Sequence, residues 1–159
     1  MRFVRPVFVL ALIVALAACD SSGDGGPNDP EPQEIEGSMT AEVSGRAFEA
    51  DSIVQAHMVG STLVVEGADS TGRMIRISLL NAARGTYDIG GPTSAQAQAS
   101  YSNTLEEYEA IADTAGTLAL TRLDSLAARG TFEFIAETVG GTRIIISSGE
   151  FLAPWSDAP

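Results

Sequence analysis

The chain has 159 residues and a formal net charge of −12 at pH 7, because 21 acidic side chains outnumber 9 basic ones. This excess of acid excludes nucleic acids as binding partners and excludes peripheral binding to anionic lipid surfaces, since both kinds of binding need clustered positive charge. The single cysteine, Cys19, leaves no second thiol for a disulfide bond within the chain or for a cysteine-based metal site.

Residues 1–18 have the three-part pattern of a secretory signal. Arg2 and Arg5 supply a positive end, and an unbroken apolar run follows from Val7 to Ala18. This run is too short to cross a bilayer as a permanent helix, which needs about 20 residues. It ends in small side chains, as a cleavage site requires. We therefore predict that residues 1–18 are a signal peptide.

The stretch Leu16-Ala17-Ala18-Cys19 resembles the lipobox, the processing signal of bacterial lipoproteins. The resemblance implies that the Cys19 thiol receives a diacylglyceryl group and that the leader is cut between Ala18 and Cys19. It also implies acylation of the freed amine, and two or three acyl chains hold a protein on a membrane where one does not. We expect a protein whose lipidated N-terminus lies in a membrane of the cell envelope, on the periplasmic or surface side. The choice between inner and outer membrane stays open.

Residues 19–37 comprise the lipidated cysteine and an acidic stretch rich in Pro and Gly. From Asp20 to Glu36 the stretch contains no basic residue, and Ile35 is its only large apolar side chain. Such a composition buries too little apolar surface to offset the entropy of ordering, which predicts a disordered stalk. A flexible chain of this length spans about 20–25 Å on average. That distance is enough to lift a domain clear of the lipid headgroups.

From residue 38 to residue 154 the dominant hydrophobic period is two. Ile75, Ile77 and Leu79 share one parity, and Phe132 and Phe134 do the same further along. Such alternation marks β-strands with one buried face and one solvated face. Turns that contain Gly or Asp separate these runs at hairpin spacing. We predict a single all-β domain, an antiparallel β-sandwich or partly closed barrel of about 8–11 short strands.

The strands are placed near residues 38–44, 46–50, 52–59, 62–68, 73–80, 86–89, 97–102, 106–111, 116–122, 129–138 and 142–151. Residues 105–112 also fit a helix, because Leu105, Tyr108 and Ile111 would then share one face. We predict a strand there and leave the helix open as the alternative. Residues 155–159 are predicted to form a C-terminal tail.

Five segments of the domain combine strand and turn residues in a characteristic order, namely 39–48, 85–87, 116–124, 128–134 and 142–151. They resemble a group of short β-rich lipoproteins of unknown function from Bacteroidota-type bacteria. The likeness covers residues 38–151 and implies an antiparallel sandwich or partly closed barrel. The resemblance supplies no catalytic residues.

We predict no catalytic, cofactor or metal site. His57 is the only histidine and lies on the parity of Ile53 and Val59, so we expect a packed or surface side chain rather than a catalytic base. One histidine without a free cysteine does not make a standard zinc site. The sequence also lacks a G-x-S-x-G motif and a Gly-rich phosphate loop ahead of a helix. The chain is therefore expected to have no enzymatic activity and no cofactor.

Two groups of side chains are candidates for ligand contact. Tyr101, Tyr108 and Trp155 form the aromatic set that would offer flat rings to a ligand, although we expect Trp155 to cover one end of the domain. The second group is the acidic run of Glu106, Glu107, Glu109 and Asp113. A glycosidase needs two carboxyl groups about 5–10 Å apart across a cleft. Closely spaced acids more often form a solvated face, and we favour that interpretation.

These observations favour a noncatalytic binding or interaction domain on a stalk, whose ligand is a small molecule, a glycan or another envelope protein. Two alternatives stay open. A lipocalin-like carrier would enclose an apolar cavity, although the chain lacks the Gly-x-Trp start of that family. A carboxylate-based hydrolase would bring two acids together across a groove. The sequence leaves the oligomeric state open.

Overall fold

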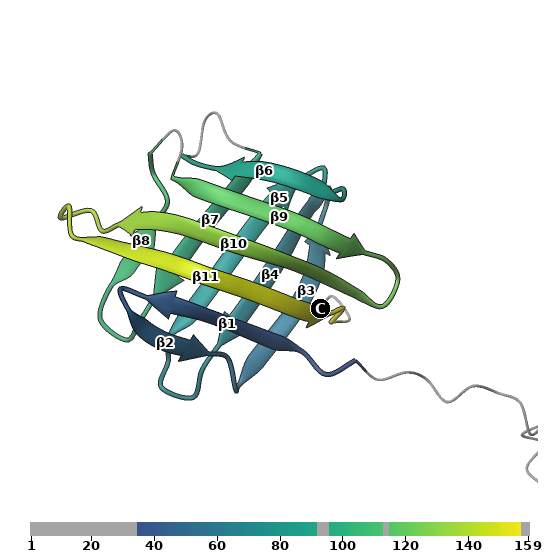
Figure 1. Ribbon diagram of the computed structural model, residues 1–159, viewed down its shortest axis with the longest axis horizontal. Helices are drawn as coiled ribbons and strands as arrows, with labels where there is room; N and C mark the ends of the chain where they lie inside the picture. The colour runs from purple at the N-terminus through teal and green to yellow at the C-terminus, as the bar shows by residue number, and fades with distance from the viewer. Residues whose placement is uncertain (1–34, 92–95, 113–114, 157–159) are drawn as a thin grey trace, which may run out of the picture. The chain divides into compact units, whose positions relative to one another are not determined.

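A computed structural model describes residues 35–91, 96–112 and 115–156 (Figure 1). The predicted signal peptide, Cys19 and the stalk up to residue 34 lie outside the described residues, as do residues 157–159 of the predicted tail. Every described residue falls within one compact unit, Glu34–Pro159, and the described chain is all-β. Among the described residues there is no helix with the length and apolarity to cross a membrane.

Eleven strands make up the described chain, one for each strand placed from the sequence. In chain order they are β1 Ser38–Val43, β2 Arg46–Glu49, β3 Ile53–Val59, β4 Thr62–Ala68, β5 Met74–Leu80, β6 Gly85–Ile89, β7 Ala97–Ser102, β8 Glu107–Glu109, β9 Gly116–Leu123, β10 Ala127–Glu137 and β11 Arg143–Pro154. The ambiguous stretch 105–112 thus holds a short strand. Strand β10 begins earlier than predicted, because Asp124 closes the preceding turn by accepting the backbone N–H groups of Leu126 and Ala127.

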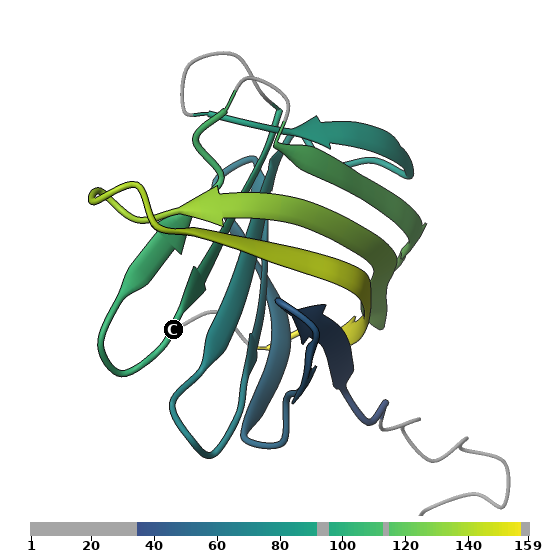
Figure 2. The ribbon, with the colours of Figure 1, turned by 60° about the vertical axis from the view of Figure 1, so that its left-hand side comes forward.

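The strands form one continuous sheet that folds into two layers (Figures 1 and 2). The front layer of Figure 1 has the order β2-β1-β11-β10-β9-β6, and the back layer continues through β7, β5, β4 and β3. The short strand β8 pairs with both β7 and β10. Strands β6, β7, β8, β10 and β9 therefore close into a small barrel. The predicted sandwich or partly closed barrel is confirmed, and β8 supplies the closure.

The core lies between the two layers and consists of the side chains that the period of two directs inward. Alternate residues of β10 are buried, and the ring centroid of Phe132 lies 6.2 Å from that of Phe134 and 6.3 Å from that of Phe151. Gly149 on β11 makes room for this cluster, since a Cβ there would lie 2.4 Å from Cε2 of Phe132. Each ring buried in this way stabilises the fold by about 1.5–3 kcal/mol.

A buried carboxylate organises the turn between β4 and β5. Asp69 accepts hydrogen bonds from the backbone N–H groups of Thr71 and Arg73, from the Thr71 hydroxyl, and from Nε of Arg73 at 2.6 Å. Arg73 donates from Nη1 to the carbonyl of Ala47 on β2 at 3.1 Å, and its guanidinium lies 5.4 Å from the ring centroid of Phe48. Asp69 thus fixes the guanidinium that joins this back-layer turn to the edge strand of the front layer.

The same contacts change the acidity of Asp69. Burial opposes ionisation, but the hydrogen bonds from Arg73 and Thr71 outweigh it and hold the pKa of the carboxyl below its ordinary value of 3.8. The group therefore loses its proton more readily in the folded chain than in the unfolded chain. Its contribution to stability is present above a pH of about 4 and is lost as the pH falls through the folded-state pKa.

Trp155 packs against the core at the end of β11 and joins three parts of the chain. Its Nε1 donates to the carbonyl of Asp124 in the β9–β10 turn at 2.6 Å. Its backbone forms a parallel bridge with Ala56 on β3, and the N–H of Ser156 donates to the Ala56 carbonyl at 2.9 Å. Residues 155 and 156, which we predicted to be tail, therefore attach the end of β11 to the edge strand of the back layer.

Substituting Asp69→Asn should lower the free energy of unfolding by about 1–3 kcal/mol at neutral pH. The amide keeps an oxygen for the N–H groups of the turn but turns an NH₂ group toward Nε of Arg73, so that a donor faces a donor. Urea unfolding, followed by the fluorescence of the single tryptophan, measures the change.

Asp88→Asn on the exposed side of β6 is the matched control, since no hydrogen bond between described residues involves the Asp88 carboxylate. The stability gap between the wild type and Asp69→Asn should narrow as the pH falls from about 4 through the lowered folded-state pKa of Asp69, because the carboxyl then gains a proton as well. Equal stability at neutral pH, or a gap that widens on acidification, would contradict the role given to this carboxylate.

Candidate functional site

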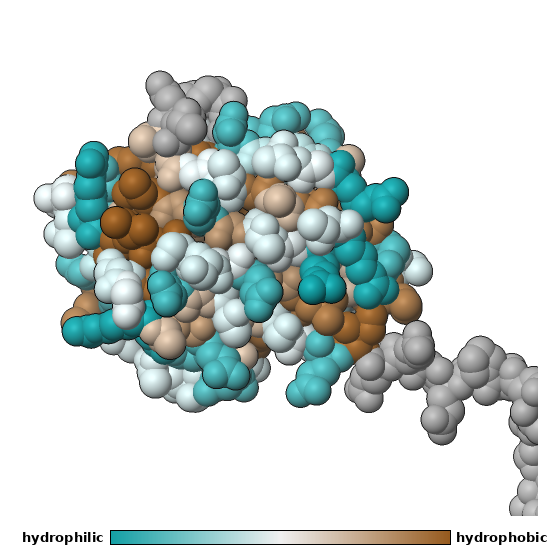
Figure 3. Space-filling model, in the orientation of Figure 1, coloured by the Kyte–Doolittle hydropathy of each residue, from teal (hydrophilic) through white to brown (hydrophobic). Residues whose placement is uncertain are grey.

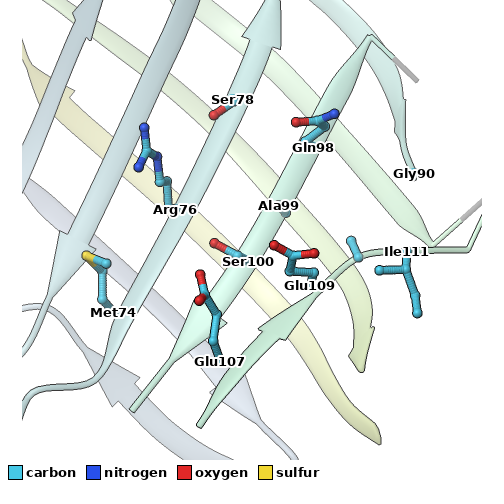
Figure 4. A pocket seen from close by; sticks show the side chains of 11 residues that line it. Met74, Arg76, Ser78, Gly90, Gln98, Ala99, Ser100, Glu107, Glu109 and Ile111 are labelled. Atoms are coloured by element: carbon cyan, nitrogen blue, oxygen red, sulfur yellow. The ribbon is translucent and has the colours of Figure 1, made fainter. Parts of the chain in front are cut away.

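A groove lies on the outer face of the back layer, over β5, β7 and β8 (Figure 4). It is open to solvent and has a volume of about 350 Å³. The lining side chains that can form hydrogen bonds are Arg76, Ser78, Gln98, Ser100, Glu107 and Glu109. Met74 and Ile111 add apolar surface to the same lining. The groove is therefore a mixed site, with donors and acceptors from three neighbouring strands.

The groove exists because short side chains on β7 lie between long side chains on β5 and β8. In the sheet, Ser100 on β7 is in register with Arg76 on β5 and with Glu109 on β8. Figure 4 shows Arg76 on one side of Ser100 and Glu109 on the other. Neighbouring strands are about 4.8 Å apart, so the backbones that carry the two charged residues lie about 10 Å apart. A serine hydroxyl forms the floor between them.

Arg76 has a partner on the side away from the groove floor. Its Nε lies 3.5 Å from Oε1 of Glu66 on β4, and Oε2 of Glu66 accepts a hydrogen bond from Gln55 at 3.0 Å. The Arg76 side chain is 47% exposed, so this ion pair contributes little to stability. A guanidinium carries five N–H donors and this contact uses one of them. Arg76 therefore keeps donors for a ligand.

Glu109 on the other wall faces a like charge. It lies directly opposite Glu137, at the residue pair that joins β8 to β10. Glu137 is paired with Arg143, whereas no described residue pairs with or donates a hydrogen bond to the carboxylate of Glu107 or Glu109. Like charges opposite each other are destabilising. Glu107 and Glu109, which form the anionic wall of the groove, thus have no cation partner within the described part of the chain.

A second hollow of about 180 Å³ adjoins the anionic wall. Its lining residues are Glu107, Glu109, Ile111, Glu137, Thr138 and Val139. Because three of these residues also line the groove, the two hollows meet at strand β8. A ligand on β8 would contact both of them.

The three aromatic residues predicted to contact a ligand do not form one exposed surface. Tyr101 and Tyr108 lie side by side with ring centroids 5.9 Å apart, but both are buried in the core. A hydrogen bond to Glu106, reinforced by burial, raises the pKa of Tyr108, and burial raises the pKa of Tyr101. Trp155 lies elsewhere, at the end of β11, with its Nε1 bonded to Asp124. None of these rings lines the groove.

His57 lies half-buried on β3, opposite Val64 of β4. Its Nδ1 atom is buried and has no hydrogen-bond partner among the described residues. The histidine is outside the groove lining. Over residues 35–91, 96–112 and 115–156, no group of three His, Cys, Asp or Glu side chains could hold a metal ion. The sequence predicts a packed or surface side chain here, and the ring of His57 is in fact half-buried.

The interior between the layers is occupied by one connected cluster of apolar side chains, which includes Phe132, Phe134 and Tyr101. Four hollows lined by described residues are open to the outside. None of these four is the enclosed apolar cavity that a lipocalin-like carrier would use. Of these four hollows, the groove over β5, β7 and β8 has the most hydrogen-bonding side chains in its lining.

An apolar patch lies on the outer face of the front layer. Ile135 on β10 is exposed directly opposite the exposed Ile145 on β11, and Val139 is fully exposed in the turn between these strands. Figure 3 shows hydrophobic side chains gathered at this end of the front layer. Val139 also lines the second hollow, so the apolar hairpin tip borders the groove region.

Comparison with known protein families identifies the β domain. Residues 36–153 match a family described as a domain of unknown function (DUF6252). The chain belongs to this family. The match runs from just before β1 almost to the end of β11, so the family domain contains the whole barrel and the groove. No curated protein and no solved structure matches the chain.

The sequence prediction includes two of the groove residues, Glu107 and Glu109, as part of an acidic run, but it does not include Arg76 or Ser100. The signal that could have found these two is the small-residue strand at 97–102 beside strands with charged outward positions. Strand order and register are also needed, because only pairing aligns Arg76, Ser100 and Glu109 in one row.

Substituting Glu109→Gln should raise the free energy of unfolding by about 0.2–1 kcal/mol, because it removes a like charge opposite Glu137. Glu133→Gln is the matched control, since Glu133 is exposed on β10 and lies opposite Thr117. Urea unfolding of both variants measures the difference. A loss of stability in Glu109→Gln, or an equal gain in Glu133→Gln, would show that the local repulsion is absent.

Proposed function

We propose that this protein is a lipid-anchored protein of the cell envelope whose β domain is a noncatalytic binding domain. Its binding surface is the groove over β5, β7 and β8. The anchor is supported by the apolar run 7–18 and by the lipobox-like stretch Leu16-Ala17-Ala18-Cys19. The acidic stretch that follows supports a stalk between the anchor and the domain.

The observation that carries the binding role is the groove itself. It is a hollow in the outer face of a sheet, and its lining includes hydroxyl, amide, guanidinium and carboxylate groups. Binding sites for small ligands combine a concave shape with a few convergent polar groups. Since the interior is occupied by core side chains, a ligand would approach the domain from outside.

The chemistry of the lining supports a noncatalytic role. The groove contains neither histidine nor cysteine. Its two carboxylates, Glu107 and Glu109, stand on the same face of one strand instead of facing each other across a cleft. A carboxylate-based hydrolase needs an acid on each side of the bond it cleaves. Binding therefore accounts better for this arrangement than hydrolysis does.

The anchor is tested by mass spectrometry of the protein purified from bacterial membranes. The expected product begins at Cys19, carries a diacylglyceryl group on the thiol and lacks residues 1–18. Cys19→Ser should lose all incorporation of a labelled fatty acid, whereas the control Ser22→Ala should keep it. An unmodified Cys19, or an intact leader on the mature protein, would rule out the anchor.

The binding surface is tested by filling the groove. Ser100→Tyr places a ring on the floor between Arg76 and Glu109, and Thr131→Tyr places the same ring on the exposed face of β10 as a control. Nuclear magnetic resonance titrations with amino acids, short peptides and oligosaccharides should shift the backbone amides of Gln98, Ser100 and Glu109 in the wild type. The shifts should persist in Thr131→Tyr and disappear in Ser100→Tyr. Shifts that survive in Ser100→Tyr, or an unperturbed groove throughout, would contradict the proposal.

A further inference from the structure

The row formed by Arg76, Ser100 and Glu109 places opposite charges on the two sides of a hydroxyl floor. Register fixes this row, since Ser100 pairs with both charged residues. The two charges do not neutralise each other, because Arg76 contacts Glu66 on the far side of β5. A ligand lying across β7 would therefore meet a cation at one end and an anion at the other.

The anionic end of the groove, formed by Glu107 and Glu109, is the end that lacks a charged partner. Glu66 is matched by Arg76 and Glu137 by Arg143, whereas Glu107 and Glu109 have no cation among the described residues. An ammonium group placed at these carboxylates would supply the cation that they lack and form charge-assisted hydrogen bonds. At the other end, the spare N–H donors of Arg76 suit a carboxylate.

The span between the two walls defines the length of the ligand. Two strand spacings separate β5 from β8, which is about 10 Å. An extended peptide covers about 3.3–3.6 Å per residue, so about three residues reach from one wall to the other. Along this path Gln98 and Ser100 offer donors and acceptors for peptide groups, and Ile111 offers apolar contact to a side chain.

We propose that the groove binds a short zwitterionic peptide of about three residues, with its free amino group at Glu107 and Glu109 and its free carboxylate at Arg76. This inference rests on the proposed function, because it takes the groove as the binding surface, and it adds the chemical class of the ligand. A neutral oligosaccharide fits less well. It would leave the two carboxylates without a cation and would bring no carboxylate to the spare N–H donors of Arg76, and the groove lining has no aromatic ring for stacking.

The test uses tri-L-alanine and its end-blocked forms as probes. Dissociation constants are measured by titration of the backbone amide signals at neutral pH. The peptide with both ends free should bind most tightly, and N-acetylation or C-terminal amidation should each weaken binding about tenfold. That factor corresponds to about 1.4 kcal/mol for one charge-assisted contact. Free alanine should bind weakly, since it is too short to reach both walls.

Variants assign each end of the peptide to its wall. In Arg76→Gln the free acid and the amide should bind equally, while N-acetylation still weakens binding. In the double variant Glu107→Gln, Glu109→Gln the reverse should hold. Arg129→Gln and Glu133→Gln on the outer face of β10 are the matched controls and should keep both effects. General damage to the fold would abolish both effects together, so the crossed pattern is specific to the proposal.

Two results separate the failure of this inference from failure of the proposed function. If end-blocked tri-L-alanine binds as tightly as the free peptide, or if cellotriose binds more tightly than either, the ligand class is wrong while the groove remains a binding surface. If no probe, peptide or sugar, shifts the groove signals, both the ligand class and the binding surface are wrong. The crossed pattern in the variants, with both effects kept in the controls, supports the inference.

Discussion

One guanidinium joins the two layers of the folded sheet at an exposed edge. Arg73 belongs to the back layer through the β4–β5 turn, yet it donates to the carbonyl of Ala47 on β2, the edge strand of the front layer. A free strand edge is a template for pairing with another chain, and Arg73 occupies one of its carbonyls. Asp69 holds the guanidinium in place, and its own burial is tolerated because both carboxylate oxygens are hydrogen-bonded. The contact between Arg73 and Ala47 therefore holds the two layers together and also blocks part of the free edge of β2 from pairing with another chain.

The parts of the fold that depend on local chemistry could be predicted from the sequence. The turn residues Ser44 and Gly45 adopt positive φ angles of 49° and 77°, and Gly141 in the last hairpin has a φ of 81°. Strand order is a different matter, because it depends on contacts between distant segments. The three-residue strand β8 closes the barrel through one pair with β10, Glu109 opposite Glu137. No local pattern indicates such a contact.

The candidate site shows the same division. Arg76 and Ser100 each look like ordinary outward residues of their own strands, and only register puts them in one row with Glu109. The tyrosines predicted to contact a ligand are buried instead of exposed. Tyr101 follows the parity of Ala97 and Ala99, which are buried, so the period that located the strand also directs this ring inward. Parity in a strand is thus better evidence for burial than aromatic character is for ligand contact.

The groove and the stability of the domain are linked through β8. The pair that closes the barrel sets Glu109 opposite Glu137, and only Glu137 has a cation partner among the described residues. Like charges opposite each other are unfavourable, and folded chains keep such local conflicts mainly where another requirement outweighs them. A cationic group bound at Glu109 would remove the conflict at the pair that completes the ring. Because a ligand that binds only the folded chain stabilises it in proportion to the logarithm of its concentration, occupation of the groove should strengthen the closure itself. The site would then couple ligand binding to the integrity of the barrel with no change in strand order.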